Sequence, residues 1–169
     1  MKGLIVIDVE KCLGCRSCQV QCALEHSLSR NLVEAIREQP APRARVRVEA
    51  VDGLAVPLQC RHCEDAPCVR VCPSHALEKP GIDDPVSVTN ERCIGCSLCI
   101  LACPFGVIDM DVTGKAIVNC DLCVERLKND RLPACVEGCP TKALQFKSLK
   151  DASSEKRRKY LTAIARGDR

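Results

Sequence analysis

The sequence is nearly without aromatic residues. It has no tryptophan, and its 169 residues include one tyrosine and two phenylalanines. Large aromatic rings usually dominate the energetics of a protein core, and a chain of this length can build only one compact domain or two small ones. The shortage of rings excludes a conventional large core, so another interaction must hold the fold together.

Long apolar segments are missing too. The nearest candidate, residues 100–108, is interrupted by Pro104 and Gly106, whereas a membrane span needs about 20 apolar residues. The first eight residues combine a very short apolar run with an early acid, Asp8, and lack the long apolar region of a secretory signal. We read them as a strand, and we expect no transmembrane segment and a cytoplasmic location.

Signatures of chemistry on an organic substrate are absent as well. The sequence shows no Ser–His–Asp set, no phosphate-cradling glycine loop and no dinucleotide fingerprint. Its only strongly basic segment, residues 147–169, has eight Lys or Arg against three acids, but nucleic-acid binding would also need stacking aromatics. We therefore predict a protein that is not catalytic alone and binds no nucleic acid.

Cysteine, by contrast, is abundant, with 16 residues in the chain. Such enrichment is typical of a disulfide scaffold or a metal protein, and in a reducing compartment a metal protein is the stronger interpretation. The cysteines form four motifs of four, with none left over. In order, motifs one to four are Cys12, Cys15, Cys18 and Cys22; Cys60, Cys63, Cys68 and Cys72; Cys93, Cys96, Cys99 and Cys103; and Cys120, Cys123, Cys135 and Cys139.

The spacing of these motifs indicates iron–sulfur clusters. Motif three has the bacterial ferredoxin arrangement C-x2-C-x2-C-x3-C-P, including Pro104, in which three cysteines and a fourth from another motif hold one 4Fe–4S cluster. Motifs two and four have longer gaps, of four and eleven residues, before their third cysteine, and motif one ends in Ala23 instead of proline. Zinc ribbons do not need third and fourth cysteines at these offsets. We therefore predict four 4Fe–4S clusters.

An internal repeat relates the motifs. A shift of 81 residues superimposes motif one on motif three, and a shift of 67 residues superimposes Cys68–Leu77 on Cys135–Leu144. Motifs one and three are thus alike, as are two and four, which implies a repeated supersecondary unit. Gly14 and Gly95 take matching places in the cysteine loops, where close approach of the backbone to a cluster favours a missing side chain.

Between the motifs, the pattern predicts β-hairpins and an exposed insert. Residues 43–58 turn at Asp52-Gly53 and predict one hairpin, and a second is expected at residues 107–118. The charged insert Val124–Ala134, which contains Arg126, should lie on the surface, either as a docking loop or as a merely solvated one. Together with short helices, these elements predict an α+β fold.

Two helices are expected outside the cysteine motifs. One is predicted at residues 31–38, stopped by Pro40-Ala41-Pro42, and the other at about residues 152–166, with Gly167 as its stop signal. Among the histidines, His62 could tune its cluster or relay a proton, but a hydrogen-bonded neighbour is the stronger interpretation. His26 and His75 are assigned no role.

At this point the chain resembles the four-cluster, ferredoxin-type iron–sulfur subunits of oxidoreductases. The resemblance runs from Asp8 to Phe146 and is carried by the sequences Glu10-Lys11-Cys12-Leu13-Gly14-Cys15, Cys60-Arg61-His62-Cys63-Glu64-Asp65-Ala66-Pro67-Cys68, Cys93-Ile94-Gly95-Cys96 and Cys120-Asp121-Leu122-Cys123. The family includes the beta subunits of molybdopterin enzymes and formate dehydrogenase. The opening sequence and Glu25-His26-Ser27 most resemble the small subunits of CO dehydrogenase and tungsten aldehyde oxidoreductase.

The resemblance implies which cysteines share a cluster. Spacing alone would also permit motif one to pair with two and motif three with four, whereas the family pairs one with four and two with three. The implied ligand sets are the Cys12 set (Cys12, Cys15, Cys18 and Cys139), the Cys120 set (Cys120, Cys123, Cys135 and Cys22), the Cys60 set (Cys60, Cys63, Cys68 and Cys103) and the Cys93 set (Cys93, Cys96, Cys99 and Cys72).

The fold that follows is two intertwined bicluster ferredoxin-like modules. The outer module comprises residues 1–28 and 104–147, the inserted module residues 59–103, the helix and hairpin connection residues 29–58, and the basic C-terminal helix residues 148–169. We expect an electron-transfer subunit that connects a catalytic oxidoreductase subunit, such as a tungsten or molybdenum enzyme or CO dehydrogenase, to a second redox partner. A free-standing polyferredoxin shuttle and a cluster storage or maturation scaffold are the alternatives.

The basic tail is expected to dock on a catalytic subunit or on another copy of this chain. Four oxidised clusters would lower the formal charge of +3 by about eight, leaving an acidic body and a basic tail. Head-to-tail contact between copies would not close and would extend into a filament. A solvated helix is the alternative.

Metal analysis tests the cysteine assignment directly. Anaerobically prepared protein should contain about 16 iron and 16 sulfide per chain and no stoichiometric zinc, because every cysteine is used as a ligand. A reproducible value near eight iron under strict anaerobiosis would mean that two of the four motifs bind no cluster.

Overall fold

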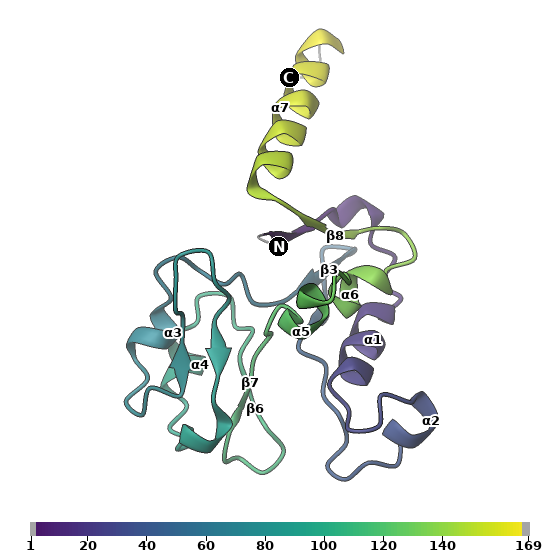
Figure 1. Cartoon of the computed structure of the whole chain (residues 1–169). Helices are drawn as coiled ribbons and strands as arrows, with labels where there is room; N and C mark the ends of the chain where they lie inside the picture. Colours follow the sequence, from purple (N-terminus) through teal and green to yellow (C-terminus); the bar gives the residue numbers. More distant parts are fainter. Residues whose placement is uncertain (1–2, 167–169) are drawn as a thin grey trace.

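The computed structural model describes residues 3–166 and shows a small α+β fold, as expected from the sequence (Figure 1). Its strands form four separate two-stranded antiparallel sheets. The elements are β1 Leu4–Ile7, η1 Val9–Lys11, α1 Ser17–Glu25, α2 Leu32–Ala35, β2 Arg47–Val51, β3 Leu54–Leu58, α3 Pro67–Arg70, β4 Leu77–Glu78, β5 Ser87–Val88, η2 Asn90–Arg92, α4 Leu98–Ala102, β6 Asp109–Met110, β7 Ile117–Val118, α5 Val124–Lys128, α6 Ala134–Glu137, β8 Leu144–Lys147 and α7 Leu149–Arg166.

Both predicted hairpins are confirmed. Strands β2 and β3 turn at Asp52 and Gly53, whose φ angles of 49° and 78° are the positive values that a two-residue hairpin turn needs. Strands β6 and β7 form the second hairpin. The helix expected at residues 31–38 is present as α2 but is shorter, and it begins where the Asn31 side chain accepts a hydrogen bond from the Val33 N–H at 3.0 Å.

The internal repeat has a structural counterpart in two of the sheets. Ile7 of β1 pairs with Leu144 of β8, and Val88 of β5 pairs with Leu77 of β4. These are the residues that the shifts of 81 and 67 relate. In each sheet the strand before one cysteine motif pairs with the strand after another, so motif one is joined to motif four and motif three to motif two.

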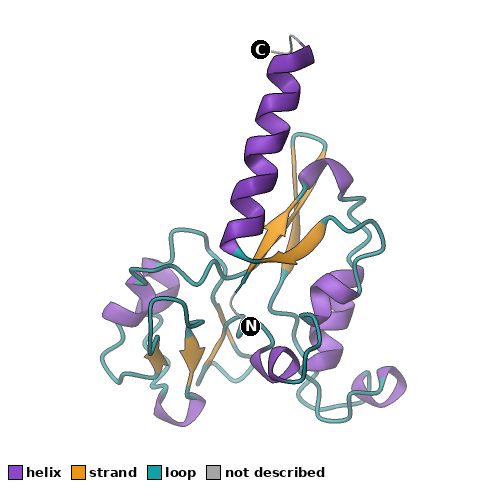
Figure 2. Ribbon diagram, turned by 45° about the horizontal axis from the view of Figure 1, so that its top comes forward, coloured by secondary structure: helices purple, strands orange, loops and turns teal. Residues whose placement is uncertain are grey.

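The buried apolar residues form two separate clusters. One packs β1 and β8 with the connecting hairpin, and the other packs β4 with the second hairpin. Figures 1 and 2 show two lobes in the same places, with α3 and α4 in one and α1, α5 and α6 in the other. Among the described residues, eight of the 24 buried apolar positions are cysteines. The interior therefore surrounds thiols more than it packs hydrocarbon.

Helix α7 projects away from both lobes (Figure 1). It begins three residues earlier than predicted because Ser148 caps it, with the Ser148 hydroxyl accepting from the Asp151 N–H at 3.1 Å. None of its described residues is buried, although Lys147 forms an ion pair with Glu155 at its base. Gly167, the predicted stop, lies outside the described residues. Within residues 3–166, no helix has both the length and the apolar character to cross a membrane.

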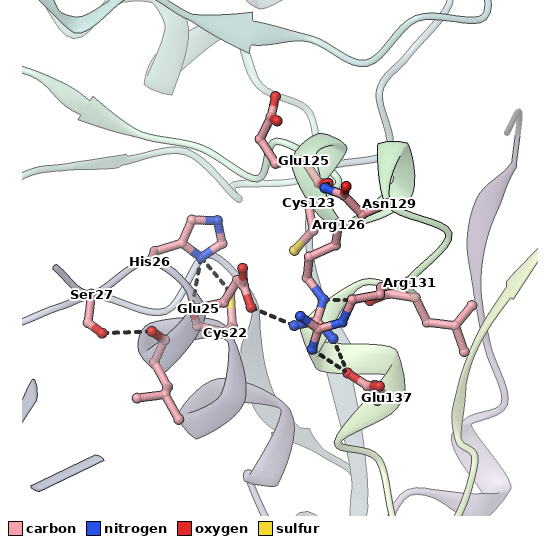
Figure 3. Close-up of polar contacts among 12 residues, drawn as sticks. Cys22, Glu25, His26, Ser27, Cys123, Glu125, Arg126, Asn129, Arg131 and Glu137 are labelled. Carbon is pink, nitrogen blue, oxygen red and sulfur yellow. Dashed lines mark hydrogen bonds and ion pairs between the residues drawn. The ribbon is translucent and has the colours of Figure 1, made fainter. Parts of the chain in front are cut away.

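The insert between Cys123 and Cys135 corrects one prediction. Glu125 and Lys128 are exposed, as expected, but Arg126 is buried. Figure 3 shows its guanidinium between Glu25 of α1 and Glu137 of α6. Arg126 donates to Glu25 at 2.6 Å and to the Leu132 carbonyl at 2.7 Å, and it also pairs with Glu137. The charge is buried because three segments supply its acceptors, which sequence spacing alone could not show.

Replacing Arg126 with methionine should destabilise the protein by about 3 kcal/mol, because Glu25 would be left as a largely buried carboxylate without its partner. Anaerobic urea unfolding followed by far-UV circular dichroism measures the loss. Since Glu137 is half exposed and can be hydrated, the expected value lies at the lower end of the range for a broken buried pair.

The matched control is Arg131→Met, which removes an exposed guanidinium 3.7 Å from the same Glu137. Its effect should stay within about 0.5 kcal/mol, as for most exposed ion pairs. Equal losses in the two variants would show that burial of Arg126 is not what stabilises this region.

Candidate metal centres

The first cysteines of motifs one and three lie on matching loops. Gly14 and Gly95 have φ angles of +66° and +68°, a backbone conformation that favours glycine. A Cβ atom at Gly95 would lie 2.9 Å from the Gly114 carbonyl oxygen. Arg16 and Ser97, two residues on in each loop, are also left-handed, with φ of 59° and 63°. These four turns bend each loop back on itself, so that its cysteines face one point.

The folded chain brings cysteines of distant motifs together. Three small enclosed cavities are each lined by four cysteines: Cys12, Cys15, Cys18 and Cys139; Cys60, Cys63, Cys68 and Cys103; and Cys72, Cys93, Cys96 and Cys99. Each group contains three cysteines of one motif and the last cysteine of another. Four thiols around one small cavity are what a 4Fe–4S cluster requires.

The remaining four cysteines, the Cys120 set, are also neighbours, although no comparable cavity separates them. All four are buried. Burial raises the pKa of the Cys135 thiol, and the nearby Cys22 and Cys123 raise it further. Burial likewise raises the pKa of Cys120 well above its ordinary value, with Cys135 and Cys22 contributing. The ligand roles of all sixteen cysteines stay a prediction, with which this grouping agrees.

Backbone N–H groups point at several of these sulfurs. Arg45 N–H donates to Cys22 Sγ at 3.2 Å, Ala76 N–H to Cys72 Sγ at 3.3 Å and His62 N–H to Cys60 Sγ at 3.4 Å. Such bonds are stronger when the acceptor is ionised. Donors directed at sulfur therefore fit thiolate ligands better than neutral thiols.

Side-chain hydroxyls add to this pattern at three positions. Ser17 lies 3.4 Å from Cys15 Sγ and lowers its pKa. For Cys72 and Cys139, burial raises the pKa, but hydrogen bonds from backbone N–H groups and from a hydroxyl, Ser74 and Thr141 respectively, outweigh it and leave the pKa lowered. All three cysteines belong to the Cys12 and Cys93 sets. In the other two sets, burial dominates and raises the pKa wherever it departs from its ordinary value.

His26, which has no role in the sequence pattern, lies beside the Cys120 set. Its Nδ1 donates to the Cys22 carbonyl oxygen at 2.7 Å, and its Nε2 lies 3.2 Å from a carboxylate oxygen of Asp121. Arg45 pairs with the same carboxylate at 2.7 Å. Figure 3 shows the imidazole next to Cys22. A lone histidine carries no pattern in a sequence, and only the adjacency of Asp121 to Cys120 placed an acid near these ligands.

His62 is a hydrogen-bonded neighbour, which agrees with the stronger interpretation of the sequence. Its Nδ1 accepts the Val86 N–H at 3.0 Å. Because Nδ1 is the acceptor, a neutral ring must carry its proton on Nε2. Burial lowers the pKa of His62 to about 4, and Lys79 lowers it further, so the ring is neutral under ordinary conditions.

Comparison with known proteins gives a consistent result. Residues 51–149 match the family described as 4Fe-4S dicluster domain. An iron-sulfur protein of Rhodospirillum rubrum is 40% identical over 86% of this chain and 82% of its own length. Electron transport protein HydN of Escherichia coli (strain K12) is 37% identical over 94% of this chain and 97% of its own. A tetrathionate reductase subunit of Salmonella typhimurium is 35% identical over 89% of this chain and 59% of its own.

Replacing Cys139 with serine tests how the motifs pair. If Cys139 is the fourth ligand of the Cys12 set, the variant should lose or shift the electron paramagnetic resonance (EPR) signal of one cluster, while the clusters of motifs two and three keep theirs. The repeat supplies a matched control, because Cys72 is the counterpart of Cys139. Cys72→Ser should alter a different signal. The pairing would be rejected if Cys139→Ser damaged only the clusters of motifs two and three.

Proposed function

Because the chain belongs to the 4Fe-4S dicluster domain family, we propose that it is the electron-transfer subunit of a larger oxidoreductase and carries four 4Fe–4S clusters on its sixteen cysteines. The observation that carries this proposal is the convergence of distant motifs, such as the approach of Cys139 to Cys12 and Cys15. The relatives support its coarser form, since their names describe iron–sulfur and electron transport proteins or a reductase subunit.

The role of the protein is to hold the clusters in line and to set their surroundings. When bound, each cluster would accept and release one electron. The backbone and hydroxyl donors at Cys22, Cys72 and Cys139 stabilise negative charge on sulfur, and burial of Cys120 and Cys135 excludes water from the interior. Different donors at different sets would give the clusters different potentials.

The ends of the chain of clusters are assigned by exposure. Cys15 and Cys96 are the exposed cysteines, and each follows an exposed apolar residue, Leu13 and Ile94, which are 75% and 67% exposed. The repeat places these residues at equivalent positions in motifs one and three. We assign the Cys12 and Cys93 sets to the two ends, where electrons are received from one partner and passed to another.

Within this proposal the two lobes are bicluster modules, with residues 59–103 inserted between residues 1–28 and 104–147. Pairing of β1 with β8 and of β4 with β5 supports that division, because each sheet joins the two motifs of one module. The catalytic partner would be an aldehyde oxidoreductase, a CO dehydrogenase or a similar metal enzyme. That one relative is named as a subunit of tetrathionate reductase supports a large catalytic partner in general.

A free-standing electron shuttle is the second candidate. The similarity to electron transport protein HydN extends over nearly the whole of both chains, and that name mentions no catalytic subunit. Anaerobic purification from the native source, followed by gel filtration, separates the two functions. A subunit should elute with a large catalytic chain and exchange electrons with it, whereas elution alone at about the mass of the chain would favour the shuttle.

Helix α7 is the proposed docking element for the partner. Its residues Tyr160, Leu161 and Ile164 are 68%, 64% and 53% exposed, and basic side chains from Lys156 to Lys159 lie one turn before them. A helix with no buried residue has little to stabilise it by packing within this chain. An acidic surface with an apolar centre, on the catalytic subunit or on a second copy of this chain, would cover it.

Truncation after Ser148 tests this role, because it removes α7 and keeps β8 paired with β1. The shortened protein should retain all its iron and its EPR signals but lose at least tenfold in affinity for its partner. Gel filtration at low and high salt measures the complex, and salt should weaken the intact complex by screening. Full assembly of the truncated chain would remove the docking role.

A further inference from the structure

The junction between the two lobes contains an unusual group of buried polar side chains. Gln59 directly precedes Cys60, and Asn119 directly precedes Cys120, so the two residues hold the same place in motifs two and four. They are 2% and 5% exposed. Polar side chains this deeply buried are normally retained for a hydrogen bond or a functional reason.

Several polar atoms of this group lack a protein partner. Among the described residues, buried side-chain atoms without a hydrogen bond are Gln59 Oε1, His62 Nε2, Asn119 Nδ2 and Asn119 Oδ1. Each such atom would cost about 1–3 kcal/mol if nothing satisfied it. Since His62 Nδ1 accepts from Val86, the group offers two donors, His62 Nε2–H and the Asn119 amide, and two acceptors.

The Asn119 amide faces sulfur of the opposite lobe. Burial raises the pKa of the Cys60 thiol, whereas the His62 N–H and then the Asn119 side chain lower it. Asn119 therefore lies close to Cys60, although it makes no hydrogen bond of ordinary length to the neutral thiol. A thiolate is a far better acceptor than a thiol. The unpaired amide donor is suited to a negatively charged sulfur at Cys60.

We propose that Asn119 is the positioning residue for electron transfer between the two lobes, with its amide donating to the Cys60 ligand while its backbone continues directly into Cys120. The inference rests on the proposed function and adds the place at which the electron passes between the Cys60 and Cys120 sets. One electron moves from one set to the other, with no proton transferred and no bond made or broken.

Two physical consequences follow from that geometry. A donor at the Cys60 sulfur stabilises the more negative, reduced form and so raises the reduction potential at the Cys60 set. The same contact fixes the spacing of the two sets, because Asn119 and Cys120 are adjacent in sequence and cannot separate. Loss of the amide should therefore change both the potential at the Cys60 set and the magnetic coupling between the two sets.

The test compares anaerobic full-length variants by EPR-monitored redox titration, with Cys103→Ser identifying the signal of the Cys60 set. Asn119→Leu should shift the reduction equilibrium at that set about tenfold toward the oxidised form, which is about 59 mV for one electron. It should also weaken the spin coupling between that set and the Cys120 set. Asn119→Gln, which keeps an amide donor, should recover part of both effects.

Two further variants keep the result interpretable. Asn119→Asp has nearly the same shape but cannot donate when ionised, so it should lower the potential even if the leucine variant fails to load iron. Asn129→Leu makes the same replacement at an exposed position of the motif four insert and should change neither quantity.

Unchanged potentials and coupling in both Asn119→Leu and Asn119→Asp would overturn the inference while leaving the proposed function intact. The proposed function fails separately if the unaltered chain, prepared anaerobically, shows no reducible clusters.

Discussion

Gathering sixteen thiols, and holding them as thiolates, is the constraint on which the rest of this structure depends. Many of these thiols are buried where ionisation is unfavourable, and the pKa of Cys18, Cys68, Cys99 and Cys123 is raised to about 11. A bound metal would displace those protons and offset the cost. With so few aromatic rings, the chain has little else to pack around. The metal centres and the hydrophobic core are therefore the same part of the molecule.

The repeat explains how a short chain meets this constraint. The sheet β1–β8 and the sheet β4–β5 use corresponding residues, and the carbonyls of Ala143 and Ala76 accept equivalent N–H bonds at 2.8 Å. The two lobes nevertheless differ around the shared framework. Motif four carries the long insert anchored by Arg126, and Asp121 of the same motif links His26 to Arg45. Duplication supplied the frame, and the differences distinguish one lobe from the other.

Local features of the sequence predicted most of the fold correctly. The turn at Asp52-Gly53, the cap at Asn31 and the cysteine loops with Gly14 and Gly95 depend on neighbouring residues, and each formed as expected. Pairing of β1 with β8 could not be predicted, because a four-residue strand has no signal for a partner more than 130 residues away. Arg126 and His26 were missed for a similar reason: their partners, Glu137 and Asp121, come from other segments, and charge alone does not indicate burial.

The two lobes also differ in how much of the chain must exist before each can form. The sheet β4–β5 joins residues 77–78 to residues 87–88, whereas β1 at residues 4–7 waits for β8 at residues 144–147. During synthesis on the ribosome, the inserted lobe can thus fold and receive iron while its surroundings are still being made. The first motif, although translated earliest, stays open until almost the whole chain has emerged. Its thiols are consequently the ones exposed longest to oxygen and to competing metals, and a cell that makes this protein has most reason to protect its N-terminal cysteines.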